Sequence, residues 1–161
     1  MVEERLHLLC GKPAAGKSTL CAQLVRTAGA VVISEDAWLA ALFGDQMASL
    51  KDFVRCSQKV RDVAGPHVVD LLRAGVTVVL DFQANTAESR AWMLGLARQA
   101  QVQAVLHHLD VPDAVCKARL TARNASGAHP FSVSEAQFDK LSAHFVPPSP
   151  DEGFRLVVHS I

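Results

Sequence analysis

Residues 11–18 of this chain, Gly-Lys-Pro-Ala-Ala-Gly-Lys-Ser, form a complete G-x-x-x-x-G-K-[ST] motif. The short apolar segment Leu6–Cys10 precedes the motif and predicts a buried strand, and the apolar spacing after the motif predicts a helix. A glycine-rich turn between a strand and a helix directs backbone N–H groups and the positive end of the helix dipole toward one point, which favours an anion there. The motif therefore predicts a phosphate-binding loop, and the alternative is a chance match on a tight strand–helix turn.

Each part of this loop has an expected role in binding a nucleotide. We expect Lys17 to reach the β- and γ-phosphates, and we expect the Ser18 hydroxyl to ligate Mg²⁺. The predicted nucleotide-binding residues are Gly11, Ala14, Ala15, Gly16, Lys17, Ser18 and Thr19.

The composition fits one globular domain spanning residues 1–161, because half of the residues are hydrophobic and a fifth are charged. Lys+Arg and Asp+Glu both total 16, so the net charge of zero argues against binding to nucleic acid or to a membrane. The acidic N-terminus leads at once into a predicted strand, so we expect a cytoplasmic protein without a signal peptide. The apolar patterns around Cys10, Cys21 and Cys116 favour buried free thiols. The oligomeric state is left open between monomer and homodimer.

Five predicted strands alternate with predicted helices along the chain. The strands are Leu6–Cys10, Val31–Ser34, Val76–Asp81, Ala104–Leu109 and Arg155–His159. The helices are Lys17–Ala28, two helices within 38–74 separated at Gly65-Pro66, Ala87–Gln101, Pro112–Asn124 and a last one from the capping sequence Ser132–Glu135 through His144. This alternation predicts an α/β fold: a three-layer, doubly wound domain with a parallel five-stranded sheet.

Two carboxylates follow predicted strands and so belong at the edge of the sheet where ligands bind. We expect the second strand to run beside the first, so that Asp36 faces the phosphate loop and accepts a proton from an attacking hydroxyl. The alternatives are that Asp36 caps the next helix or that Glu35 is the base. Asp81 ends a buried strand and is expected to hold Mg²⁺ with Ser18, although many strands end in Asp because a turn begins there.

Arg119 and Arg123 are four residues apart and share one helix face. A polar loop follows them, so we expect a lid at approximately 119–132 whose arginines stabilise the charge on a transferring phosphoryl group. The alternative is a solvated basic face near a helix C-terminus. We expect the adenine base near this lid helix and the loop before Arg155.

Other side chains allow two interpretations each. The acceptor pocket is expected between Trp38 and His67, where Trp38, Phe43 and Phe53 either wall the pocket or pack in the core. Asn85 is expected to cap the helix that begins at Ala87, with a substrate contact as the alternative. Arg90 is expected to serve the active site or to form a surface ion pair.

Four segments together resemble a known family: Gly11–Ser18, Val32–Asp36, Val78–Asn85 with Arg90, and Arg119–Arg123. They are similar to the small bacterial P-loop kinases labelled "AAA family ATPase", which are related to the 5′-kinase domain of polynucleotide kinases, to chloramphenicol phosphotransferase and to zeta toxins. The resemblance implies a P-loop NTPase fold of the nucleoside-kinase type, with MgATP as the donor and a hydroxyl as the acceptor. It also implies that Lys17 and Ser18 bind nucleotide and Mg²⁺, that Asp36 is the general base and that Arg119 and Arg123 are the lid arginines.

The resemblance has one departure that bears on the substrate. Polynucleotide kinases carry an arginine three residues after the catalytic acid, and here that position is Leu39. The sequence therefore predicts an ATP-dependent kinase whose catalytic residues are Lys17, Asp36, Arg119 and Arg123 and whose acceptor is a small molecule. The alternatives are a polynucleotide 5′-hydroxyl kinase and a nucleotide-binding switch or interaction protein without efficient transfer.

Overall fold

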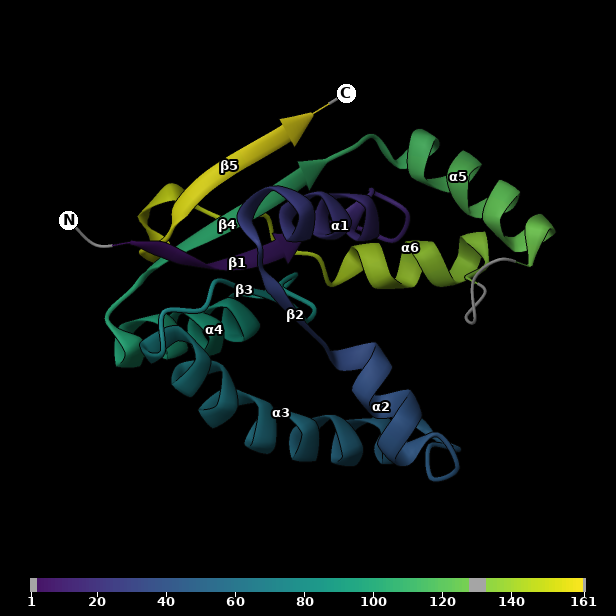
Figure 1. Cartoon of the computed structure of the whole chain (residues 1–161). Helices are drawn as coiled ribbons and strands as arrows, with labels where there is room; N and C mark the ends of the chain where they lie inside the picture. The colour runs from purple at the N-terminus through teal and green to yellow at the C-terminus, as the bar shows by residue number, and fades with distance from the viewer. Residues whose placement is uncertain (1–2, 128–132, 161) are drawn as a thin grey trace.

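The computed structural model describes residues 3–127 and 133–160 of the chain, so residues 128–132 of the predicted lid lie outside the described part. Its centre is a sheet of five strands (Figure 1): β1 (Glu4–Cys10), β2 (Val31–Ser34), β3 (Val78–Asp81), β4 (Gln103–Asp110) and β5 (Arg155–Ser160). Every strand pair is parallel, so all carboxyl ends meet at one edge of the sheet. The predicted parallel α/β fold is confirmed.

The strand order is β2-β3-β1-β4-β5, which differs from the predicted neighbourhood of the first two strands. β3 lies between them, and β2 is an edge strand. Burial follows from this order: Val78, Val79 and Leu80 of the inner strand are fully buried, whereas Val31 of the edge strand β2 is exposed.

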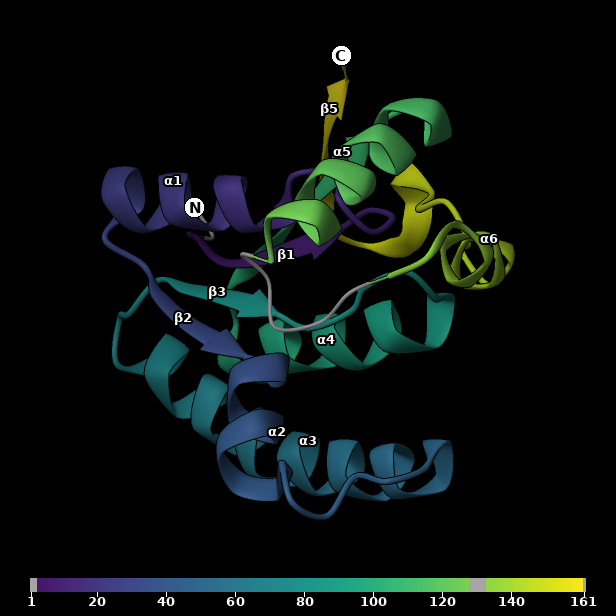
Figure 2. The ribbon, with the colours of Figure 1, turned by 90° about the vertical axis from the view of Figure 1, so that its right-hand side faces the viewer.

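Helices cover both faces of the sheet and its carboxyl edge (Figure 2): α1 (Lys17–Ala28), α2 (Glu35–Phe43), α3 (Leu50–Arg73), α4 (Ala87–Ala100), α5 (Asp113–Ser126) and α6 (Glu135–Ala143). Leu9 and Val79 pack toward Cys21 of α1 on one face. Leu8 and Leu80 pack toward α3 and α4 on the other face. A short 3-10 helix, η1 (Pro150–Glu152), precedes β5. All four cysteines are buried free thiols, as predicted for three of them.

The break between the second and third helices lies at 44–49, and the predicted break at Gly65-Pro66 is wrong. α3 continues through Pro66 for 24 residues. Gly65 packs against Trp92 of α4, where a Cβ would lie 3.4 Å from the indole ring, so tertiary packing holds the helix across the proline. Ser49 caps α3 by accepting a hydrogen bond from the N–H of Asp52.

Two predicted helix caps are also corrected. Thr86, and not Asn85, caps α4 and accepts from the N–H of Ser89. Ser134 caps α6 in a reciprocal capping box with Gln137, two residues after the predicted start at Ser132, which lies outside the described residues. In the described part of the chain, no helix is both long and apolar enough to cross a membrane.

Candidate active site

The phosphate loop connects β1 to α1 at the carboxyl edge of the sheet, where the motif predicted it. Gly16 begins the helix with φ 108°, a left-handed conformation that side chains resist. The first bond of the helix runs from the N–H of Leu20 to the carbonyl of Gly16. The N–H groups of Lys17, Ser18 and Thr19 precede this bond and have no acceptor within the helix, which leaves them available to an anion.

The Lys17 ammonium is held by the loop itself. It donates to the carbonyl of Gly11 at 2.7 Å and to the carbonyl of Lys12 at 3.0 Å. Burial lowers the pKa of Lys17, and the nearby Asp81 carboxylate opposes that shift. A buried cation held only by carbonyl dipoles can form a stronger interaction with a phosphate.

Asn85 fixes the start of the loop from the β3–α4 connection. The N–H of Gly11 donates to its Oδ1 at 3.0 Å, and its Nδ2 donates to the carbonyl of Gly11 at 3.0 Å. The Asn85 carbonyl also accepts from the N–H of Val146, which follows α6. Asn85 was expected to cap a helix. It instead joins the β3–α4 connection to the start of the phosphate loop and to the segment after α6.

The adjacent acids Glu35 and Asp36 have different surroundings. Ser34, and not Asp36, caps α2 by accepting from the N–H of Ala37 at 3.2 Å. Glu35 is only 6% exposed and accepts from Ser57 Oγ at 2.9 Å and from Arg61 Nε at 3.4 Å. Asp36 is exposed and has no hydrogen-bond or ion-pair partner among the described residues. Asp36 is therefore free to meet a ligand, whereas Glu35 is engaged by α3.

Asp81 ends β3 directly opposite Ser34 of β2, so the strand register brings it near Asp36. Burial raises the pKa of Asp81, and the Asp36 carboxylate raises it further, while Lys17 lowers it. Its carboxylate has no hydrogen-bond partner in the described part of the chain. Together with the Ser18 hydroxyl, Asp81 offers hard oxygen ligands of the kind that Mg²⁺ prefers.

Two cavities meet at these residues. The larger cavity, of about 1000 Å³, extends from the phosphate loop along α1 to α5. The smaller cavity, of about 260 Å³, lies between the phosphate loop, the start of α2 and the segment after α6. Their shared lining residues are Pro13, Lys17, Asp36, Phe53 and Asp81. The charged groups thus stand at the junction between a large and a small compartment.

Both predicted lid arginines line the larger cavity. Arg119 donates from Nη1 to the carbonyl of Ala14 in the phosphate loop at 3.3 Å. The Nε of Arg123 is buried and has no hydrogen-bond partner among residues 3–127 and 133–160. An unpaired buried guanidinium N–H is costly, so its position favours an anionic ligand in the cavity.

The walls of the cavities differ in part from the expectation. Phe53 lines both cavities, but Trp38 and Phe43 pack against the core. The opposite wall of the smaller cavity comes from Leu141 and Phe145, outside the predicted region 38–67. The segment before Arg155, where an adenine contact was expected, begins beside the site at Phe145 and ends at the amino edge of the sheet, because β5 is parallel to β4. The carboxyl end of β5 contributes His159 to the larger cavity.

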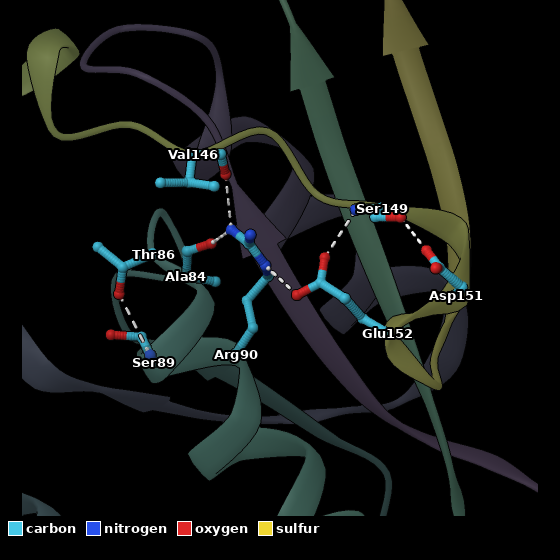
Figure 3. A network of polar contacts seen from close by, with 8 residues as sticks. All are labelled: Ala84, Thr86, Ser89, Arg90, Val146, Ser149, Asp151 and Glu152. Atoms are coloured by element: carbon cyan, nitrogen blue, oxygen red, sulfur yellow. Dashed lines mark hydrogen bonds and ion pairs between the residues drawn. The ribbon is translucent and has the colours of Figure 1, made fainter.

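Arg90 lines neither cavity. Its side chain forms a network of polar contacts with the chain before α4 and after α6 (Figure 3). Its side chain is 1% exposed, so the expected surface ion pair is wrong. Nη1 donates to the carbonyls of Ala84 and Val146 at 3.0 and 2.9 Å, and Nε donates to Glu152 at 3.0 Å. Asn85 follows Ala84 in the chain, and Phe145 precedes Val146. Both residues line the smaller cavity, so Arg90 anchors the two segments that carry these parts of its wall.

A parallel sheet, a phosphate loop after its central strand and acids at the neighbouring strand ends define the P-loop kinase fold class. The sequence profile of the AAA_33 family, described as an AAA domain, matches residues 6–148, and the chain belongs to this family. No curated protein matches the sequence significantly.

Solved structures share the fold over nearly the whole chain. A presumed kinase of Chloroflexus aurantiacus superposes with a TM-score of 0.75 at 22% identity, covering 99% of this chain and 86% of that one. A sugar kinase of Janibacter sp. gives 0.67 at 17% identity, covering 98% and 85%. The Mycobacterium tuberculosis APS kinase, in complex with AMPPNP and APS, gives 0.62 at 20% identity, covering 98% and 90%. The chain is thus similar in fold to kinases with different acceptors.

Proposed function

We propose that this protein is an ATP-dependent kinase that transfers the γ-phosphate to a hydroxyl of a small molecule. The observation that carries the proposal is the junction of the two cavities, where Lys17, Asp36 and Asp81 line both compartments. A kinase must bring a nucleotide and an acceptor together at one point while each keeps its own binding surface. The larger cavity fits the nucleotide and the smaller cavity fits the acceptor.

The groups around the larger cavity suit a triphosphate. Three kinds of hydrogen-bond donor there can bind an anion: the free N–H groups at the start of α1, the Lys17 ammonium and the Nε of Arg123. Within the described residues these donors are unpaired or bound only to carbonyl oxygens. A similar fold binds AMPPNP in the M. tuberculosis APS kinase, which supports ATP as the donor. Arg119 and Arg123 would stabilise the charge that spreads over the phosphoryl group during transfer.

Ser18 and Asp81 would hold Mg²⁺, and their uncommitted oxygens fit that role. The ion would supply charge neutralisation on the phosphate oxygens.

Asp36 is the proposed general base. The acceptor oxygen forms a bond to the γ-phosphorus, the bond from this phosphorus to the bridging oxygen breaks, and ADP leaves with the electron pair. The proton of the acceptor hydroxyl passes to the Asp36 carboxylate. Glu35 is a poorer candidate for this step because Ser57 and Arg61 both bind its Oε2 and its side chain is buried.

The test compares Asp36→Asn with Glu35→Gln in transfer of labelled phosphate from MgATP to a panel of hydroxylated compounds. We expect Asp36→Asn to lower kcat by about 10²- to 10⁴-fold, while the Kd for MgATP changes less than about threefold. Glu35→Gln, the matched control, should retain most of the transfer activity. Equal loss of transfer and nucleotide binding in Asp36→Asn would refute the assignment of the base.

The panel should include oligonucleotides with a 5′-hydroxyl, because the sequence leaves a polynucleotide kinase as an alternative. Leu39, which replaces the arginine of those kinases, is 2% exposed and packs in the core, so it offers nothing to a nucleic acid phosphate. Labelling of the oligonucleotide would favour this alternative. Nucleotide binding without any transfer would favour a switch or interaction protein.

A further inference from the structure

The smaller cavity has a lining that restricts the charge of what it can hold. Its floor is polar and is made by the phosphate loop, the start of α2 and the end of β3, whereas its sides are apolar and are made by Phe53, Leu141 and Phe145. A volume of about 260 Å³ suits a small organic molecule or one end of a larger one.

The positive charges on this lining are already engaged. Among the described residues that line the smaller cavity, the cations are Lys12 and Lys17. Lys12 forms an ion pair with Asp113 at 2.9 Å, and Lys17 faces the phosphate loop, where the donor phosphates are proposed to bind. The segments outside the described residues contain no lysine or arginine, so they add no permanent positive charge.

Arg61 stands close by but is not available either. It binds the Glu35 carboxylate at 3.4 Å, and its guanidinium lies 5.0 Å from the Trp92 ring centroid and 5.9 Å from that of Phe82. It lines a separate groove between α3 and α4. A phosphate or sulfate on the acceptor would therefore find no free cation in the cavity.

Negative charge, in contrast, is in excess at the junction. Asp36 and Asp81 both line the cavity, and neither carboxylate has a hydrogen-bond or ion-pair partner in the described part of the chain. In the proposed MgATP complex, Mg²⁺ would offset the charge of Asp81, so an anionic acceptor would be repelled by Asp36 and by the donor phosphates, at short range and in a partly buried site where screening is weak.

The apolar sides are suited to an uncharged or cationic group. Phe53 is 42% exposed and Leu141 is 44% exposed, so both have apolar surface to cover. The Lys12 ammonium lies 5.7 Å from the Phe145 ring centroid, so that ring already faces a cation, and the aromatic surface left for the acceptor is that of Phe53.

We propose that the acceptor is an alcohol with an apolar part and no negative charge, and that a positively charged acceptor is used better than an uncharged one of the same size. The inference rests on the proposed kinase function and adds the class of acceptor. It excludes alcohols that already carry a phosphate, sulfate or carboxylate group.

The experiment measures phosphate transfer from MgATP to matched acceptors in three charge states: amino alcohols, their N-acetylated forms, and the corresponding alcohols with a phosphate in place of the amine. Binding of MgATP is measured separately by calorimetry. We expect kcat/KM to fall by about tenfold or more from the cationic to the anionic member of each set. An anionic acceptor that is used as well as its uncharged counterpart would overturn the inference and leave the kinase function intact. No transfer to any acceptor, with MgATP still bound, would overturn the kinase function and the inference with it.

A pair of variants tests the same point through the protein. Phe53→Arg adds a cation to the wall that the two cavities share, and Val54→Arg, the matched control, adds it at an adjacent position that is 60% exposed and lines neither cavity. We expect Phe53→Arg to lower kcat/KM for a cationic acceptor by about tenfold and to lower it less for an anionic one. Val54→Arg should change both values by less than about twofold. Equal losses for both charge states in Phe53→Arg would contradict the proposed charge selection.

Discussion

Replacement of Arg90 by methionine tests how the two walls of the site are held in place. Methionine can fill much of the same buried volume, but it cannot donate a hydrogen bond. The carbonyls of Ala84 and Val146 would lose their bonds to the guanidinium, and Glu152 would lose its charge partner. The change is therefore a removal of polar contacts more than a change in packing.

The expected loss of stability follows from these three contacts (Figure 3). Hydrogen bonds to a charged group contribute about 1.5–3 kcal/mol each, and removal of one partner of a buried ion pair costs about 3–5 kcal/mol. Glu152 is 25% exposed and can regain water, which reduces its share. We expect Arg90→Met to lower the free energy of unfolding by about 4 kcal/mol, a large part of the roughly 5–15 kcal/mol of an ordinary domain.

The assay is urea unfolding at pH 7, followed by circular dichroism and by tryptophan fluorescence. Glu152→Gln is the control, because it keeps an acceptor oxygen for Arg90 Nε and removes only the charge, and we expect a loss of about 1 kcal/mol. A loss below about 1 kcal/mol in Arg90→Met would refute the argument that this side chain anchors the β3–α4 connection and the segment after α6. Similar losses in both variants would show that the charge of Glu152 dominates the network.

Two further changes probe the phosphate loop and a row of histidines that crosses β1, β4 and β5. Asn85→Ala removes the two 3.0 Å hydrogen bonds to the buried N–H and carbonyl of Gly11. We therefore expect the Kd for MgATP, measured by calorimetry, to rise about tenfold. An unchanged Kd would show that the phosphate loop keeps its shape without Asn85. His107 lies between His7 and His159 in a hydrogen-bonded row across three strands, and burial together with these neighbours lowers its pKa from 6.5 to about 4. Between these pH values the unfolded chain binds a proton that the folded chain does not, so stability should fall by up to about 3 kcal/mol as pH falls from 6.5 to 4. Urea unfolding at several pH values should show this fall in the free energy of unfolding, and the fall should be smaller in His107→Val. An equally large fall in the variant would exclude His107 as its source.

The parts of the fold that depend on local chemistry could be predicted from the sequence. The phosphate loop needs its glycines and its lysine within eight residues, and a strand and a helix flank it directly. The five strands were found because continuous apolar runs in a parallel sheet are buried on both faces. The positions of β2 and β3 were missed because alternating strands and helices are compatible with more than one strand order. The alternation does not decide whether β2 or β3 pairs with β1. The exposure of Val31 at the sheet edge is a property of the assembled sheet.

The errors in the site have the same origin. Asn85 stands next to the true cap, Thr86, and local sequence favours capping for both residues. Its bonds to Gly11 join residues 74 positions apart, which no local pattern indicates. Glu35 and Asp36 are neighbours with the same chemistry, and only the packing of α3 against α2 shows that one is engaged and the other free. The break before α3 could have been found from Gly44 and from the Ser49–Asp52 capping sequence.

A ten-residue segment, 81–90, explains how the carboxyl edge of this sheet is organised into a site. Its first residue, Asp81, faces the cavity junction; Asn85 in its middle holds the start of the phosphate loop; its last residue, Arg90, ties the segment to the chain after α6. Because β3 lies directly beside β1, this segment starts next to the phosphate loop and needs no distant element to reach it. The predicted neighbourhood, with β2 beside β1, would have put Asp36 next to the loop as well. The observed order places Asp81 against the loop and Asp36 across the junction, on the side where the acceptor is proposed to bind.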